Sequence, residues 1–275
     1  MEIHKPKAAH SAREFLIEIG TIICGILIAL GLEQLLEHLR WEGLVAQTRE
    51  QLRAEAGLNV TDGLKWLSVS PCLDEELTQL RDHVWEARRT GSFVPPPRAY
   101  EPSLQGFQTD AWLNARSAQV TDHLPAQELR DYSSFYFWPV DIASPEVSLH
   151  QVAAELEPLD RALDRVTPAE ADEFISRIGQ AREYQSRVIY GAIMMARSGQ
   201  RLKAPVDLHD HLQLLELSRA LRGDCVLDAA KVNDALQSAR SVTAAYDKLG
   251  IDNTSRLSAA YFSSNSPRPG GSHPK

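Results

Sequence analysis

The stretch Phe15–Leu36 reads FLIEIGTIICGILIALGLEQLL, and it constrains the rest of the chain more than any other segment does. Its uninterrupted apolar part, Ile19–Leu32, lies between Glu18 and Glu33. A helix over the whole stretch rises roughly 33 Å, which is enough to cross a hydrocarbon core of ~30 Å. The stretch therefore predicts one membrane-spanning helix, with the lipid bilayer as its first partner.

Two other interpretations of this stretch are open. A core helix of a soluble protein fits the short charge-free run, but apolar and small residues cover every face of Ile19–Leu32 and leave no polar stripe. A cleaved secretory signal fits the basic N-terminal tail and the small residues Ala29 and Gly31. Against cleavage, the helical pattern continues past Gly31 without a break. A retained span is the favoured interpretation.

The residues Glu18–Ile22, Gly25–Leu30 and Glu33–Gln34 resemble an N-terminal signature of uncharacterised bacterial single-span membrane proteins. The anchor of that family reads roughly I-G-E/T-I-x-x-x-x-G-I-L-I-A-L and continues into a long charged helix. The resemblance covers Arg13 to about Trp41. It implies a bacterial protein of the inner membrane, and it implies no activity.

The chain beyond the anchor shows no strand alternation, so we predict an all-α fold in which one transmembrane helix continues into a stalk and a helical bundle. The predicted divisions are an N-terminal tail (1–14), the transmembrane helix (15–36), a juxtamembrane stalk helix (37–59), an all-α domain (60–262) and a disordered tail (263–275).

Local signals place the helices of this domain. Ser70-Pro71 is typical of a helix start, with serine as the N-cap and proline at the first position. Thr167–Glu170 is a capping box, and Pro158 predicts a break. The proline-rich segment Gly91–Gly106 predicts a stiff loop. We expect helices at Glu33–Asn59, Ser70–Thr90, Thr109–Val120, Pro125–Phe137, Pro145–Val166, Thr167–Ser198, Pro205–Leu221 and Val226–Leu249.

Charge and motif content limit the function classes. The net charge is −8 and the basic residues are scattered, which argues against a nucleic-acid partner. The sequence contains no nucleophile elbow, phosphate loop or zinc-binding H-E-x-x-H, so we predict no catalytic, metal or cofactor residue and no cofactor. His209 and His211 are two residues apart and point to different sides of a helix, which suits a polar turn better than a metal site. The aromatic segment Tyr132–Trp138 is either core or a binding platform.

Three cysteines bear on the compartment. Cys24 lies in the predicted span, whereas Cys72 and Cys225 lie beyond it. Cys72 and Cys225 are either a disulfide pair in an oxidising compartment or two unrelated buried thiols. The basic residues just before the span (Lys5, Lys7, Arg13) equal in number those just after it (Arg40, Arg49, Arg53), so the charge count leaves the orientation open. A short basic tail before a first span usually stays in the cytoplasm. The C-terminal domain is accordingly expected in the periplasm.

One face of the predicted span has a pattern of its own. Thr21, Gly25 and Ala29 are four residues apart, which lets two helix backbones approach closely, and Glu18 falls on the same side. This face predicts a homo-oligomer or a partner membrane protein, although small residues are common in any span. Glu18 either serves an ion-driven complex or reaches the headgroups.

These patterns favour a membrane-tethered helical interaction or scaffold module. Two alternatives stay open: an accessory subunit of an ion-driven membrane complex that uses Glu18, and a membrane-anchored enzyme without a recognisable motif. An enzyme is the less favoured of these classes.

Overall fold

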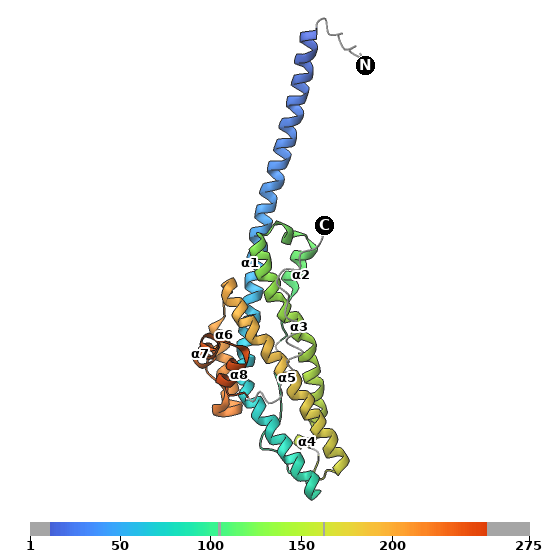
Figure 1. The fold of residues 1–275 in the computed structure, drawn as a ribbon, viewed down its shortest axis with the longest axis vertical. Helices are drawn as coiled ribbons and strands as arrows, with labels where there is room; N and C mark the ends of the chain where they lie inside the picture. Colours follow the sequence, from blue (N-terminus) through green and yellow to red (C-terminus); the bar gives the residue numbers. More distant parts are fainter. Residues whose placement is uncertain (1–11, 104–105, 162, 252–275) are drawn as a thin grey trace.

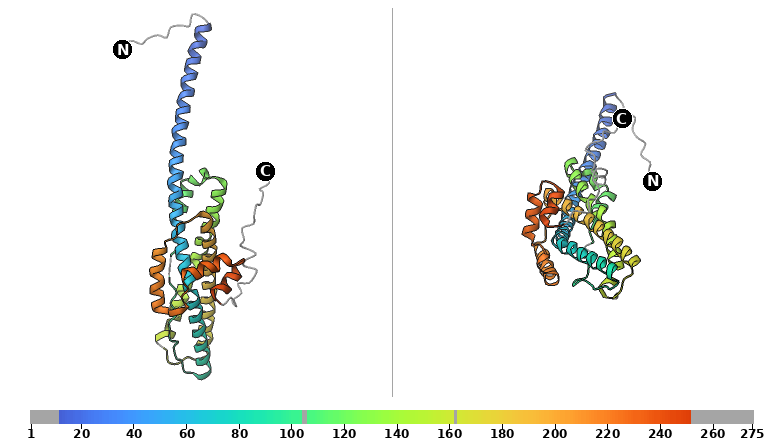
Figure 2. Two further views of the ribbon diagram at one scale, coloured as in Figure 1. Left: turned by 90° about the vertical axis from the view of Figure 1, so that its left-hand side faces the viewer. Right: turned by 60° about the horizontal axis from the view of Figure 1, so that its bottom comes forward.

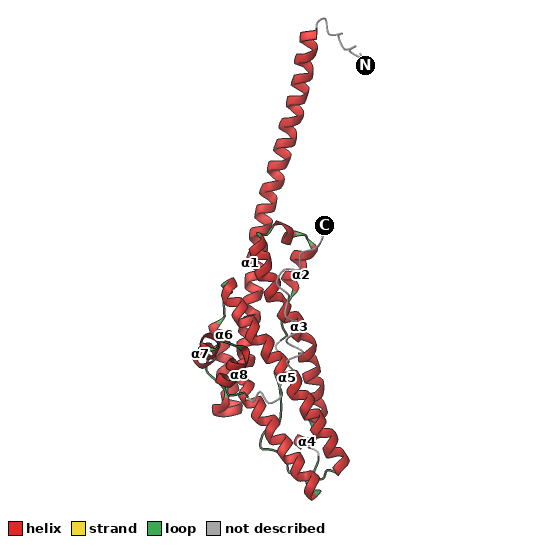
Figure 3. Cartoon of the chain, in the orientation of Figure 1, coloured by secondary structure: helices red, strands yellow, loops and turns green. Residues whose placement is uncertain are grey.

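The computed structural model describes residues 12–103, 106–161 and 163–251. This part of the chain is helical and contains no strand, apart from an isolated antiparallel bridge between Ser92 and Arg165 (Figure 3). The all-α prediction is confirmed. The predicted tail at 263–275 lies outside the described residues.

The first helix, α1 (Ala12–Thr90), is the longest element and links the two parts of the molecule. Its first part stands clear of the other helices, and its second part is one wall of the domain (Figure 1). No described residue from Arg13 to Arg40 is buried. The predicted divisions after residues 36 and 59 are therefore crossed by one continuous helix.

The predicted helix start at Ser70-Pro71 is wrong, because α1 continues through Pro71. A proline inside a helix removes one N–H and leaves a carbonyl oxygen one turn earlier without its usual donor. Here neighbouring carbonyls find other donors: Ser70 Oγ donates to Trp66 O at 2.5 Å, and Leu227 N donates to Ser68 O at 2.9 Å. These bonds tie the turn before the proline to the Ser70 side chain and to the segment after η2.

Helix α5 (Pro168–Leu202) packs closely against both α3 (Ala126–Leu156) and the second part of α1 (Figures 1 and 2). Helix α3 reaches α1 through long side chains such as Tyr136, whose hydroxyl donates to Leu52 O at 3.1 Å. Together these three helices enclose most of the core. Large side chains that are almost fully buried come from each of them, including Trp66, Leu73, Phe135, Ile142, Leu149, Ile189 and Ile193.

Helix α3 differs from the prediction, which placed two separate helices at Pro125–Phe137 and Pro145–Val166. It runs unbroken through Pro139 and Pro145, both of which are buried. Packing of the aromatic residues around them outweighs the local preference of proline. The helix ends where predicted, before Pro158, which begins the short α4 (Pro158–Arg161).

The predicted capping box at the start of α5 is confirmed. Thr167 Oγ1 accepts from Glu170 N at 3.3 Å, and Thr167 N donates to Glu170 Oε2 at 2.8 Å. Both bonds satisfy donors that the first turn of a helix leaves without partners.

The remaining elements are short. The segment before α3 holds α2 (Asp110–Ser117) and a 3₁₀ turn, η1 (Val120–His123). The C-terminal part holds α6 (Leu208–Arg222), η2 (Gly223–Cys225), α7 (Ala229–Ser238) and α8 (Val242–Leu249). The single helix expected over Val226–Leu249 is wrong. It is divided because Arg197 Nη2 donates to the carbonyls of Ala239 and Ser241, and the hydroxyl of Ser241 caps α8.

Candidate functional site

One helix in the described part of the chain is long and apolar enough to cross a membrane, and it is the first part of α1. None of its most apolar window is buried against the rest of the structure. A core helix would be mostly buried, so this arrangement disfavours the core-helix interpretation. Leu27 and Leu36 are 63% and 69% exposed, which is a large apolar surface for water to contact.

The predicted helix-contact residues Glu18, Thr21, Gly25 and Ala29 lie on this projecting part and are all exposed. Thr21 Oγ1 donates to Ile17 O at 2.8 Å, so the hydroxyl is satisfied within the helix. A Cβ added to Gly25 would meet nothing within 4 Å. The face is therefore uncovered by the described part of the chain and accessible to a partner.

Beyond the apolar stretch, two contacts fix the direction of α1 relative to the domain. Trp41 stacks on His123, with 3.9 Å between the ring centroids. Arg49 donates from Nε and Nη2 to the carboxylate of Glu128 at 2.8 to 3.0 Å. Such fork-shaped pairing adds geometric specificity. Any anchor at the start of α1 is thus coupled to the domain by a continuous helix with side contacts.

An open groove lies between α2, η1 and α3. Helix α2 and the first part of α3 lie on the half of the domain nearer to the projecting helix (Figure 1). The volume of the groove is about 580 Å³, within the range of small-molecule or peptide sites. The residues that line it are Trp112, Arg116, Thr121, Leu129, Ser133, Tyr136, Phe137, Val140 and Asp141.

Buried polar residues of α1 position the wall of this groove. The carboxylate of Glu55 accepts from Ala111 N at 2.8 Å and from Trp112 N at 3.4 Å, and so it binds the first turn of α2. Asn59 exchanges two hydrogen bonds with the backbone of Gln108, at 2.7 and 2.8 Å. These bonds fix α2 to α1 although α2 itself is short.

The groove combines an apolar floor with two charged residues. Trp112 and Tyr136 are stacked with centroids 5.2 Å apart, and the guanidinium of Arg116 lies 6.0 Å from the Trp112 ring centre. Burial raises the pKa of Asp141, and the nearby Arg187 partly offsets this. The arrangement suits binding of an apolar or aromatic surface that also carries a polar group.

The aromatic segment singled out in the sequence divides between core and groove. Tyr132, Phe135 and Trp138 are buried, as expected for core residues, whereas Phe137 is 39% exposed and lines the groove. Sequence reasoning did not identify Trp112 or Arg116. Only the docking of α2 on α1 brings them to α3.

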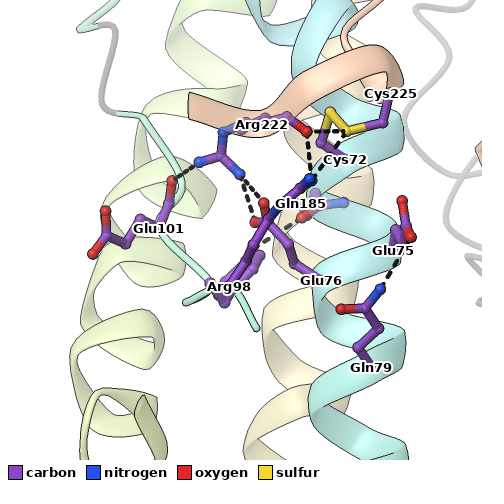
Figure 4. Close-up of polar contacts among 10 residues, drawn as sticks. Cys72, Glu75, Glu76, Gln79, Arg98, Glu101, Gln185, Arg222 and Cys225 are labelled. Atoms are coloured by element: carbon purple, nitrogen blue, oxygen red, sulfur yellow. Dashed lines mark hydrogen bonds and ion pairs between the residues drawn. A yellow bond between two sulfur atoms is a disulfide. The ribbon is translucent and has the colours of Figure 1, made fainter. Parts of the chain in front are cut away.

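A second polar site surrounds the two cysteines beyond the span (Figure 4). Cys72 on α1 and Cys225 in η2 are brought together and joined by a disulfide, with a Cα–Cα distance of 5.2 Å. Beside them Arg222 forms an ion pair with Glu76, and Arg98 Nη1 donates to Arg222 O. The site fastens the C-terminal helices to α1.

The ion pair in this site is largely withdrawn from water. The side chains of Glu76 and Arg222 are 4% and 14% exposed, and Arg222 Nη2 also donates to Glu101 O at 2.5 Å. Burial raises the pKa of Glu76, and the charge of Arg222 opposes the rise. Two chain segments, the proline-rich loop and the end of α6, therefore depend on one guanidinium group.

Among the described residues, no group of three or more His, Cys, Asp or Glu side chains could hold a metal ion. His209 and His211 lie in α6, and their side chains are outside the described part. The polar-turn interpretation of these two residues stays a prediction.

No family model, curated protein or solved structure matches this chain. The function must therefore be argued from the projecting helix, the groove and the disulfide site.

Proposed function

We propose that this protein is a single-pass membrane protein whose all-α domain is a tethered interaction module. The observation that carries the proposal is the apolar first part of α1, which is exposed along its length and continuous with the domain. The exposed side chains of an apolar helix of this length are more stable in a lipid bilayer than in water. The helix would hold the domain at a fixed height and direction beside the membrane.

We assign the domain to the periplasmic side of a bacterial inner membrane. The basic tail before the span and the Cys72–Cys225 disulfide support this orientation, and the resemblance of the anchor supports the bacterial inner membrane. Disulfides persist in oxidising compartments such as the periplasm and are rare in the cytosol. The free thiol, Cys24, is the one that lies inside the apolar stretch, where the bilayer would shield it.

We assign partner binding to the groove between α2 and α3. Phe137 and Val140, on one face of α3, line this groove and are 39% and 58% exposed. Exposed apolar clusters of this kind mark interaction sites, and a helix with an apolar face fits between two helices. The action of the module is positional: it presents this groove to a partner near the same membrane.

A photoreactive residue at Val140 tests the assignment in intact cells. Its matched control is the same residue at Gln237, which is exposed on α7 away from the groove. We expect an adduct of defined mass at Val140 and none at Gln237. Equal adducts at both positions, or none at Val140, would overturn the groove assignment.

Thiol labelling of the same cells shows which compartment holds the all-α domain. In a Cys24→Ala background only Cys72 and Cys225 remain, and a maleimide of high mass added under denaturing conditions counts free thiols. We expect no mass shift without reductant and two additions after reduction. Two additions without reductant would overturn the periplasmic assignment, because the cytosol keeps thiols reduced.

A further inference from the structure

A second periodicity runs along the projecting part of α1 and continues beyond the span. It consists of apolar or small residues at alternating intervals of three and four positions, namely Ile22, Gly25, Ala29, Leu32, Leu36, Leu39, Gly43 and Ala46. We call this row the α1 seam. An apolar repeat with an average spacing of 3.5 residues is the pattern of a left-handed coiled coil.

The structure leaves the α1 seam uncovered. Every member is exposed, with Leu32, Leu36 and Leu39 at 57%, 69% and 54%, and a Cβ on Gly43 would meet nothing within 4 Å. The bundle lies elsewhere, since the buried positions Val45, Thr48 and Leu52 fall about half a turn from Gly43 and Ala46. A helix could lie along the α1 seam without displacing the domain.

Both ends of the α1 seam are marked by acidic residues. Glu18 stands four residues before Ile22, and Glu50 stands four residues after Ala46. Beyond Glu50 the same side of α1 is covered by the chain itself, because a Cβ on Gly57 would lie 2.0 Å from the carbonyl oxygen of Pro205. Paired helices would diverge there to make room for the segment that leads into α6.

The flanking positions are compatible with pairing of identical, parallel helices. In a parallel coiled coil, the residue directly before every second seam position (Ile22, Ala29, Leu36 and Gly43) faces the residue five positions later on the other helix. Leu35 then faces Arg40, and Glu42 faces Gln47, so no like charges oppose each other between the two acidic ends. Single-span chains that insert in the same direction also present this seam at the same height in the bilayer.

We propose that the α1 seam binds the α1 seam of a second copy of this chain, forming a parallel two-stranded coiled coil from Ile22 to Ala46. The proposal rests on the membrane-spanning assignment given above. Trp41 and Glu55, which contact η1 and α2, lie on the side of α1 away from the α1 seam, so the groove of each copy stays open. The roughly three turns from Leu36 to Ala46 give the pairing leucine contacts that a small-residue face within lipid lacks.

Cysteine scanning from Leu36 to Ala46 in the full chain, in a Cys24→Ala background and native membranes, tests this proposal. The Cys72–Cys225 disulfide is internal and yields no dimer on a non-reducing gel. With a mild oxidant we expect dimers at Leu36, Leu39 and Gly43. We expect little dimer at Glu37 and His38, which lie off the seam.

A second variant measures the strength of the pairing. Leu39→Glu places like charges opposite each other, and we expect about a tenfold loss of dimer formed through a cysteine at Gly43, which corresponds to ~1.4 kcal/mol. His38→Glu is the matched control and leaves the dimer yield unchanged. Equal yields for the two variants would overturn the proposal, as would aperiodic dimers or adducts with a different protein.

Alkaline flotation of the same membranes separates this proposal from the span. If the chain floats with lipid and the dimers show no period, pairing fails and the span stands. If the dimers show the period and the chain does not float, the membrane assignment fails and pairing stands.

Discussion

The two parts of α1 belong to one helix yet have opposite surroundings. From Ile22 to Leu39 the large apolar side chains are exposed, whereas Leu52, Leu73 and Leu77 in the second part are fully buried. Within the first part Ile19–Leu32 is apolar on every face, and the second part carries polar residues between its buried ones. Because both parts are helical, they do not differ in secondary structure. They differ in what surrounds their side chains.

The comparison also shows where polar groups are placed. In the second part, Glu55, Asn59 and Glu76 are buried on α1 and bind neighbouring segments. In the first part the carboxylates stand at the ends of the apolar run, as at Glu18 and Glu33. Buried polar groups need partners, and a lipid-facing surface offers none. The difference is what a helix passing from lipid into a protein core requires.

The largest expected effect comes from adding charge to the first part. Leu27→Arg with Leu30→Arg places two guanidinium groups in the middle of the apolar run, and each costs about 2.5–3.5 kcal/mol at the centre of a span. We expect the chain to lose its membrane retention, measured by alkaline extraction followed by flotation.

Leu217→Arg with Leu221→Arg is the matched control. Both leucines are exposed on α6, at 58% and 71%, but they belong to the domain. This variant should still float with lipid. If the Leu27/Leu30 variant also floated, the exposed first part of α1 would not be the anchor.

A smaller effect is expected from the buried ion pair in the second part. Arg222→Met leaves Glu76 without its partner, and breaking a buried pair costs about 3–5 kcal/mol. Chemical denaturation of the full chain in detergent measures this loss. Arg89→Met, which removes the exposed partner of Glu86, should cost about 0–1 kcal/mol.

The loss of folding stability caused by Arg222→Met should depend on pH in a defined direction. Burial already raises the pKa of Glu76, and removing the guanidinium raises it further. When the pKa of a carboxyl is higher in the folded than in the unfolded protein, its protonated form stabilises the fold. This stabilisation is complete below the unfolded-state pKa and is lost as the pH rises through the folded-state pKa. The variant should therefore be less impaired in acid than at neutral pH. A loss that is independent of pH would show that Glu76 does not cause it.

Local signals in the sequence predicted much of this fold. They placed the apolar stretch, the all-α class, the capping box at Thr167 and the break before Pro158, because each depends on residues close together in the chain. They failed at Pro71 and Pro145, where distant contacts keep the helix continuous. A proline predicts a boundary only when nothing from elsewhere compensates for it.

The candidate site was less accessible to sequence reasoning. The groove needs Glu55 to bind the start of α2, a contact across a separation of more than fifty residues. Likewise Cys72 and Cys225 are 153 residues apart, so their spacing left the pairing open. The residues of the exposed apolar stretch could be listed in advance because Ile19–Leu32 is apolar on every face.

The smallest expected effect compares two glycines of α1. Gly57 lies in the second part, where an added Cβ would be 2.0 Å from Pro205 O, a backbone atom. Gly43 lies where the helix leaves the apolar stretch, and an added Cβ would meet nothing within 4 Å. Gly57→Ala should cost about 1–3 kcal/mol through overpacking. Gly43→Ala should gain about 0.5–1 kcal/mol, because alanine loses less conformational entropy in a helix.

Denaturant unfolding of the two variants in the same detergent decides between packing and helix propensity. Both substitutions make the same chemical change on the same helix, so propensity alone would shift the two midpoints in the same direction. Opposite shifts mean that contact with the segment before α6 begins between these two positions. Equal gains would show that the domain does not close on α1 at Gly57, and the boundary between its two parts would then lie further along the helix.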